Sequence, residues 1–137
     1  MKISGIDYLA VVTAAVNAFF WTAAYYVVLF KNWREAAGWS PGEVRGRTSL
    51  ATYLATFIGL LIMAWVLAAL SSQFGPGHMN ARSGALYAAL IWLGFVAPII
   101  AINNVIGGRK YMLSVIDGVN WLVVLLIEGA FIGVMTA

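Results

Sequence analysis

The sequence predicts an all-α membrane protein in which four transmembrane helices form an antiparallel bundle. Of its 137 residues 63% are hydrophobic and only 9% are charged, whereas a soluble domain has about 25% charged residues. Four runs lack Asp, Glu, Lys and Arg, apart from two acids in the last: 8–30, 48–81, 83–108 and 111–137. A helix needs about 20 mostly apolar residues to cross a bilayer, so each run can cross once. Because two of the connections are short, neighbouring helices are expected to be antiparallel, in one domain covering 1–137.

The first span is expected at about residues 6–29, and a basic linker follows it. Ala10, Ala14 and Ala18 lie four positions apart in this span, the small-residue spacing that lets two helices approach closely. The linker, 31–47, carries four basic residues and two tryptophans. Indole rings favour the headgroup layer and basic groups favour anionic lipid, so the linker is expected to lie along the membrane surface.

A capping signal inside this linker predicts a short surface helix between the first two spans. Residues 40–43, Ser-Pro-Gly-Glu, have Ser and Glu at capping-box spacing, with Pro at the first helical position. The second span is expected at about 49–70. It ends before the Gly-Pro-Gly sequence of residues 75–77, which cannot continue a helix.

The third span, about 83–105, is predicted to be kinked. Pro98 lacks a backbone N–H, and its ring clashes with the carbonyl group four residues earlier, which bends a helix. Gly107-Gly108 then supplies the helix stop. The fourth span is expected at about 112–135.

The distribution of basic residues predicts the orientation of the chain in the membrane. The linker after the first span and the turn after the third lie on one side and carry six Lys and Arg residues. The opposite side, with both termini, carries only Lys2 and Arg82. Because basic loops stay in the cytoplasm, both termini are expected outside it.

Three polar side chains share one face of the fourth span. At 100° per residue, Asp117, Asn120 and Glu128 fall at about 0°, 300° and 20° around the helix. A polar face is costly in lipid, so it is expected to face other helices, a second subunit or water. Asp117 lies about two helical turns from Arg109 and Lys110, so it is expected to pair with one of them near the interface.

Glu128 lies about 16 Å further along the helix, beyond the middle of the span, and its side chain is too short to reach the far headgroups easily. A charged side chain in hydrocarbon costs about 3 kcal/mol or more. Glu128 is therefore expected to be protonated and hydrogen-bonded or paired with a cation, for which Arg82 and His78 are candidates. An acid in this position either exchanges a proton or an ion, or bonds across a helix interface.

Two further polar or aromatic groups have structural and functional interpretations. Asn103 and Asn104, together with the expected kink, form a polar cluster that either caps a helix end or lines a site. Aromatic residues gather around the end of the first span: Tyr25, Tyr26, Phe30, Trp33 and Trp39. They are expected to form an interfacial belt, with an aromatic pocket as the alternative.

The same aromatic residues carry a resemblance that extends over nearly the whole chain. Its motifs are Tyr25-Tyr26 with Phe30-Lys31 and Trp33, then Gly38, then Trp92-Leu-Gly-Phe95 with Pro98, then Asn103-Asn104 and Gly108-Arg109. This pattern resembles domain-of-unknown-function family 1761, although the family usually has Trp-Tyr where this chain has Tyr25-Tyr26. The resemblance implies a small four-helix integral protein of the bacterial cytoplasmic membrane, and it implies no activity.

Several function classes are disfavoured by what the sequence lacks. It has no cysteine, one histidine in a loop, and no lysine inside a span. Metal clusters, paired haem ligands, Schiff-base lysines and serine–histidine–aspartate sets are therefore not expected, and neither is a phosphate-binding loop or a nucleic-acid-binding patch. No enzyme and no cofactor is predicted, and the lipid bilayer is the expected environment.

Two functions remain open from the sequence. The leading one is a membrane interaction protein or accessory subunit, either joined to another membrane protein or forming a homo-oligomer, as a homodimer packed through Ala10, Ala14 and Ala18 or through Gly129 and Gly133.

The competing function is a small proton- or cation-coupled transporter or channel. There Glu128 binds the ion, Asn120 and Asn17 line the path, and the kinked third span gates it.

Overall fold

The computed structural model describes residues 5–40, 42, 49–75 and 77–136, and it confirms the predicted fold class. Four helices are long and apolar enough to cross a membrane: Tyr8–Val28, Leu50–Phe74, Ala81–Ile106 and Tyr111–Met135. The described part of the chain is helical and contains no strand. The bounds agree with the predicted spans to within a few residues, because each helix ends close to the point where its charge-free run ends. The chain is a multi-pass membrane protein.

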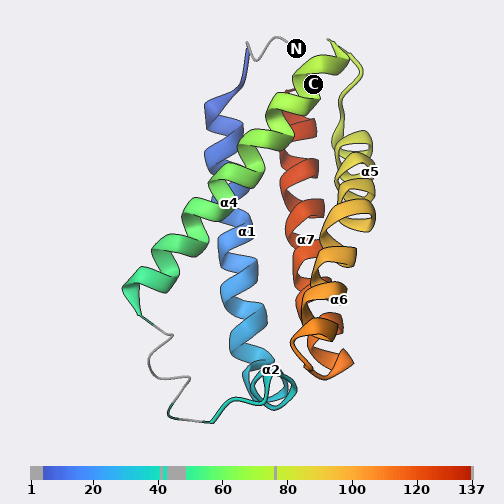
Figure 1. Ribbon diagram of the computed structural model, residues 1–137. Coiled ribbons are helices and arrows are strands. Elements are labelled where there is room, and N and C mark those ends of the chain that lie inside the picture. Colours follow the sequence, from blue (N-terminus) through green and yellow to red (C-terminus); the bar gives the residue numbers. More distant parts are fainter. Residues whose placement is uncertain (1–4, 41, 43–48, 76, 137) are drawn as a thin grey trace.

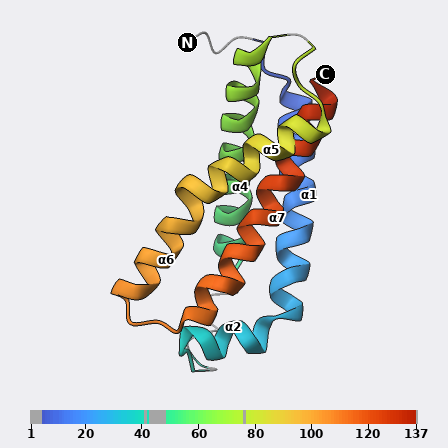
Figure 2. The same cartoon turned by 90° about the vertical axis from the view of Figure 1, so that its right-hand side faces the viewer.

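The first span, α1 (Tyr8–Val28), is followed almost directly by a short helix, α2 (Phe30–Ala37). The Asp7 side chain caps α1 by accepting a hydrogen bond from the Ala10 amide at 3.1 Å. α2 ends at Gly38, whose φ of 72° suits a residue without a Cβ atom. It runs across the end of the bundle (Figure 2). The capping signal predicted at 40–43 depends on Pro41 and Glu43, which lie outside the described residues.

The second span consists of α4 (Leu50–Ser71) and the one-turn 3₁₀ helix η1 (Ser72–Phe74). The chain then turns through Gly75 and Gly77, which have φ angles of 79° and 80°. This confirms the predicted end of the span. α5 (Ala81–Ile91) begins at a capping box in which Asn80 and Ser83 exchange hydrogen bonds of 3.0 and 2.9 Å.

The third span is interrupted where the kink was predicted. A π-helical segment, η2 (Trp92–Val96), separates α5 from α6 (Ala97–Ile106), and Pro98 lies in the first turn of α6. A π-helical turn accommodates a missing backbone donor without ending the helix. α7 (Tyr111–Met135) is the fourth span.

α7 is the central helix of the bundle. It packs against α1, α4, α5 and α6, and it also contacts α2. The end of the bundle at which α2 lies is called the α2 end below. α4 crosses α1 at an angle, so their lower ends diverge, and both ends of the described chain lie at the opposite end (Figure 1). The core is built largely from small and aliphatic side chains of α1, α4 and α7.

Small residues of α5 and α7 let these two helices touch backbone to backbone. A Cβ atom added to Gly84 would lie 2.0 Å from the Gly129 carbonyl oxygen, and one added to Gly133 would lie 2.2 Å from the Asn80 carbonyl oxygen. The GxxxG face of the fourth span is therefore filled by another helix of the same chain.

The small-residue face of the first span is filled in the same way. Ala10, Ala14 and Ala18 are completely buried within the chain. The spacing predicted close helix approach correctly in both spans, and both small-residue faces are used inside the chain. The homodimer expected from the sequence stays a prediction.

Candidate functional site: an aromatic cavity beside a buried polar face of α7

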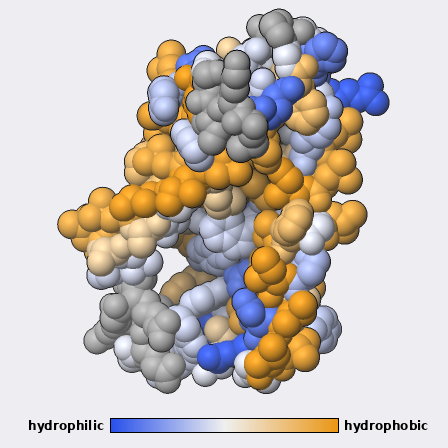
Figure 3. All heavy atoms as spheres, turned by 45° about the horizontal axis from the view of Figure 1, so that its top comes forward, coloured by the Kyte–Doolittle hydropathy of each residue, from blue (hydrophilic) through white to orange (hydrophobic). Residues whose placement is uncertain are grey.

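A cavity of about 900 Å³ lies between α1, α4 and α7, where α4 diverges from α1. Seven aromatic side chains line it: Phe19, Tyr26, Phe30, Trp33, Trp39, Tyr53 and Trp121. Figure 3 shows the hollow beside the orange side chains of α4, with paler, less hydrophobic residues in its floor. The cavity therefore has a strongly aromatic wall inside a mainly aliphatic bundle.

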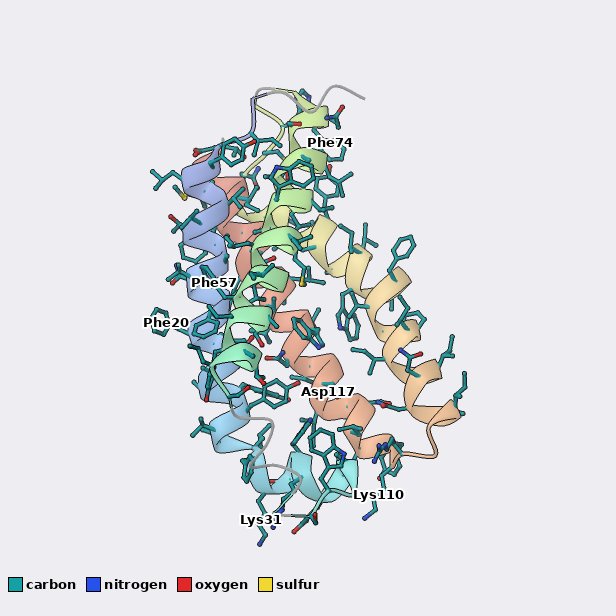
Figure 4. The ribbon with its side chains drawn as sticks, turned by 60° about the vertical axis from the view of Figure 1, so that its left-hand side comes forward. Phe20, Lys31, Phe57, Phe74, Lys110 and Asp117 are labelled. Atoms are coloured by element: carbon teal, nitrogen blue, oxygen red, sulfur yellow. The ribbon has the colours of Figure 1, made fainter. Side chains whose placement is uncertain are left out.

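Asp117 is the acidic residue of the cavity wall. The Tyr26 hydroxyl donates a hydrogen bond to its Oδ1 atom at 2.6 Å, and Trp33 lines the same cavity. Figure 4 places Asp117 on α7 above the level of α2, with Lys31 and Lys110 below it at the end of the bundle. The carboxyl is thus held by a side chain of α1 and remains in contact with the cavity.

The partners predicted for Asp117 are wrong. The Arg109 guanidinium donates instead to the backbone carbonyl of Ala37, and Lys110 is an exposed residue at the start of α7. Within residues 5–40, 42, 49–75 and 77–136, no basic side chain pairs with Asp117. The reason is that α1 packs antiparallel to α7 and brings the Tyr26 hydroxyl to the acid, while Arg109 is bound at the end of α2.

The aromatic residues around Asp117 form a connected cluster. Ring centroids lie 6.1 Å apart for Tyr26 and Trp33 and 4.8 Å apart for Trp33 and Trp39, in edge-to-face geometry. Tyr25 does not line the cavity, and its hydroxyl donates to the Ile116 carbonyl at 2.7 Å. The structure therefore favours the pocket over the interfacial belt for Tyr26, Phe30, Trp33 and Trp39.

Asn120 and Glu128 lie deeper in the bundle, and both are fully buried. Within the described part of the chain, neither the amide of Asn120 nor the carboxyl oxygens of Glu128 have a hydrogen-bond partner. Both alternatives predicted for Glu128, a hydrogen bond or a cation, are therefore missing there. Arg82 is exposed at the start of α5, and His78 is exposed in the loop before it.

The register of α1 against α7 places a third buried polar group beside Asn120. The hydrogen bonds from Tyr25 to Ile116 and from Tyr26 to Asp117 fix which residues of the two helices are level. Both helices rise by the same distance per residue and run in opposite directions, so a step back along α1 corresponds to an equal step forward along α7. Thr22 is therefore level with Asn120, and its buried hydroxyl also has no partner among the described residues. Thr22 lines the cavity, whereas Asn120 and Glu128 lie behind its wall.

The remaining predicted site residues lie elsewhere. Asn17 is on the outer face of α1, where its side chain donates to the Thr13 carbonyl at 2.9 Å, so it cannot line an internal path. Asn104 donates to the Ser114 hydroxyl at 3.0 Å and ties α6 to α7. Asn103 is exposed. Within the described ranges, no group of three metal-ligating side chains occurs.

Sequence reasoning missed the residues that α4 contributes to the cavity. Thr52, Thr56, Gly59 and Met63 line it together. Their spacing of four, three and four residues is the repeat of one helix face. That repeat was readable in the sequence, and only the packing of α4 decides that this face borders a cavity rather than lipid.

The comparisons with known proteins agree with the resemblance carried by the aromatic motifs. No curated protein and no solved structure matches the chain. A family model described as "Protein of unknown function (DUF1761)" matches residues 9–133, which cover all but the outermost one or two residues of the four spans. The chain therefore belongs to the DUF1761 family.

Proposed function

We propose that this protein is a small membrane carrier in which Glu128 exchanges a proton for a small cationic solute. The observation that carries the proposal is the complete burial of the Glu128 carboxyl without a partner in the described part of the chain. Burying an unpartnered polar group costs about 2–7 kcal/mol relative to water. A group that costs stability and holds nothing together is explained by function, and a carboxyl in an apolar bundle can hold a proton that a cation replaces.

The polar groups on α7 support a path from the cavity to Glu128. Asp117 borders the cavity, and Asn120 follows one helical turn later, level with Thr22 of α1. Glu128 lies about 16 Å beyond Asp117 at 1.5 Å per residue. In the proposed mechanism the solute enters at Asp117, passes the Asn120 and Thr22 amide and hydroxyl groups, and displaces the proton of Glu128.

The interrupted third span supplies the movement that such a path requires. η2 divides the span into α5, which is fixed to α7 by the contact at Gly84, and α6, which has no buried residue. π-helical turns often occur at functional sites because their register can shift. We propose that α6 moves relative to α5 about η2 while the solute passes.

The accessory-subunit function stays a prediction with less support. It rested on small-residue faces, which are used inside the chain. The outer face of the third span remains, and its exposed side chains Leu90, Leu93, Phe95, Ile99 and Ile102 are all apolar. Lipid covers a face of this composition as well as a protein does, so we propose lipid as its partner.

Reconstituted protein tests the proposed exchange. Proteoliposomes are loaded with a pH-sensitive dye, and one class of solute at a time is added outside them: alkali cations, organic ammonium cations, carboxylates or neutral sugars. We expect at least one cationic solute to change the internal pH with the wild type and to leave it unchanged with Glu128→Gln. Glu35→Gln, which removes an exposed acid on α2, is the matched control and should behave as the wild type. The proposal is contradicted if Glu128→Gln gives a response of equal size, or if the wild type responds to none of the solutes.

We also propose that the α2 end of the bundle faces the cytoplasm of a bacterial cell and that both termini face away from it. The support is the excess of Lys and Arg at the α2 end. Because the chain has no cysteine, single replacements report the side directly. In intact cells a membrane-impermeant maleimide is expected to label His78→Cys and to label Lys31→Cys only after permeabilisation. The reverse labelling pattern would show the opposite orientation.

A further inference from the structure

We propose that the aromatic cavity binds an organic ammonium cation with alkyl substituents, with its charged nitrogen next to Asp117. In naming the solute of the carrier, this inference rests on the proposed function. The binding itself follows from the cavity, and it can be measured without any proton movement.

The charge of the cavity selects a cation. The Asp117 carboxyl is in the wall and accepts a hydrogen bond from the Tyr26 hydroxyl, a donor that stabilises negative charge without neutralising it. Arg109 is engaged with the Ala37 carbonyl. Since no basic side chain of the described residues pairs with Asp117, the negative charge is left for a ligand, and an anionic ligand is disfavoured.

The aromatic wall selects an organic cation rather than a metal ion. The faces of tryptophan and tyrosine rings attract ammonium groups, and several rings around one cation are the usual design of quaternary-ammonium sites. Trp33 and Tyr26 adjoin Asp117 directly, and Trp121 follows it on the next turn of α7. A charge held at Asp117 is therefore within a short distance of ring systems from three helices.

The oxygen atoms of the cavity are too few to replace the hydration shell of an alkali or alkaline-earth ion. Such ions take about six or more oxygen ligands. The Thr56 hydroxyl donates to the Thr52 carbonyl at 2.8 Å, and the Thr52 hydroxyl lies 3.3 Å from that of Ser49. These hydroxyls are engaged within α4, and the other oxygen-bearing side chains of the wall are Asp117, Thr22 and the two tyrosines Tyr26 and Tyr53. The wall thus offers a single carboxylate and a few scattered hydroxyls rather than a shell of oxygen ligands.

The size and the opening of the cavity fit an amphiphilic molecule. A volume of about 900 Å³ falls in the range of sites for small organic ligands, and the wall is mainly apolar. Val27 and Tyr53, which line the cavity from α1 and α4, are 76% and 49% exposed, so the cavity opens between these helices toward the membrane. Alkyl groups can therefore enter from the bilayer while the ammonium group reaches Asp117.

Binding of tetraethylammonium to the full chain in phosphatidylglycerol nanodiscs tests the inference. Quenching of tryptophan fluorescence and calorimetry are expected to give one saturable site that Na⁺ does not compete for. We expect Asp117→Asn to raise the Kd at least tenfold, and the matched control Glu35→Gln, an exposed acid outside the cavity, to leave it unchanged. Equal affinity in Asp117→Asn and the wild type, or no binding by the wild type, overturns the inference.

Two further arms keep the result interpretable. If Asp117→Asn does not fold, Trp121→Leu is measured instead and is expected to raise the Kd several-fold, whereas an unchanged Kd overturns the inference. Adding phosphatidylethanolamine to the nanodiscs distinguishes a lipid headgroup from a free solute as the occupant. If the lipid displaces tetraethylammonium, the occupant is the lipid ammonium group. If tetraethylammonium stays bound, the occupant is a free cation. Binding without solute-driven pH changes refutes only the carrier, and pH changes without binding refute only this site.

Discussion

Gly84→Ala is expected to destabilise the protein strongly, although it adds a single methyl group. The added Cβ atom would lie 2.0 Å from the Gly129 carbonyl oxygen and 3.3 Å from the Gly133 Cα atom, so α5 and α7 would have to separate. Overpacking of a tight contact costs about 1–3 kcal/mol or more. The measurement is the midpoint of thermal unfolding of the purified protein in detergent, followed by near-ultraviolet circular dichroism.

Gly94→Ala is the matched control for this substitution. It lies in the same span, and a Cβ atom built there meets nothing within 4 Å. Alanine is favoured over glycine in a helix by about 1 kcal/mol, so this variant should unfold at the wild-type temperature or above it. Equal midpoints for the two variants would mean that the close contact of α5 and α7 does not exist.

Glu128→Leu is expected to raise the unfolding temperature and to abolish the solute-driven pH change at the same time. The side chain is completely buried, and its oxygens have no partner within the described ranges. Replacing a buried polar group of this kind with a hydrophobic residue of similar size removes a penalty of about 2 kcal/mol or more. Stability gained together with activity lost is the behaviour of a functional residue that the fold tolerates at a cost.

A structural role for Glu128 predicts the opposite result. If the carboxyl held helices or subunits together, Glu128→Leu would lower the unfolding temperature or change the size of the detergent-solubilised particle. Leu125→Ala, one turn earlier on α7, serves as the comparison, because loss of a buried leucine side chain should destabilise the protein by about 2–5 kcal/mol. A fall in both variants would assign Glu128 to the packing of the bundle.

The helices were predictable from the sequence because their causes are local. Charge-free runs of sufficient length set the four spans, and Pro98 marks the interruption at η2. The small-residue spacings also predicted close helix contacts correctly. They could not tell whether the partner is a second copy or the same chain, because that depends on which helices the loops bring together.

The site was less predictable because its contacts join residues far apart in the sequence. Helical periodicity placed Asp117, Asn120 and Glu128 on one face of α7, and the burial of Asn120 and Glu128 agrees with this. Sequence distance favoured Arg109 and Lys110 as partners of Asp117. The observed donor Tyr26 is 91 positions away and is brought there by the antiparallel packing of α1 and α7.

The relative importance of the two acids changes as a result. Depth along the fourth span predicted an ordinary interfacial charge at Asp117 and a functional question only at Glu128. The divergence of α4 from α1 opens a cavity at Asp117, and no local pattern encodes the crossing angle of two helices. In the proposed carrier, Asp117 therefore recognises the solute and Glu128 exchanges the proton.

Infrared difference spectroscopy of the reconstituted protein tests the exchange most directly. A protonated carboxyl has a C=O stretching band that ionised carboxylates lack, and Glu128→Gln identifies which band belongs to this residue. We predict that the Glu128 band is present without solute and disappears when a cationic solute that changes the internal pH of proteoliposomes is added. A band that persists at saturating solute would contradict the account, because the proton of Glu128 would then stay in place while the cation binds.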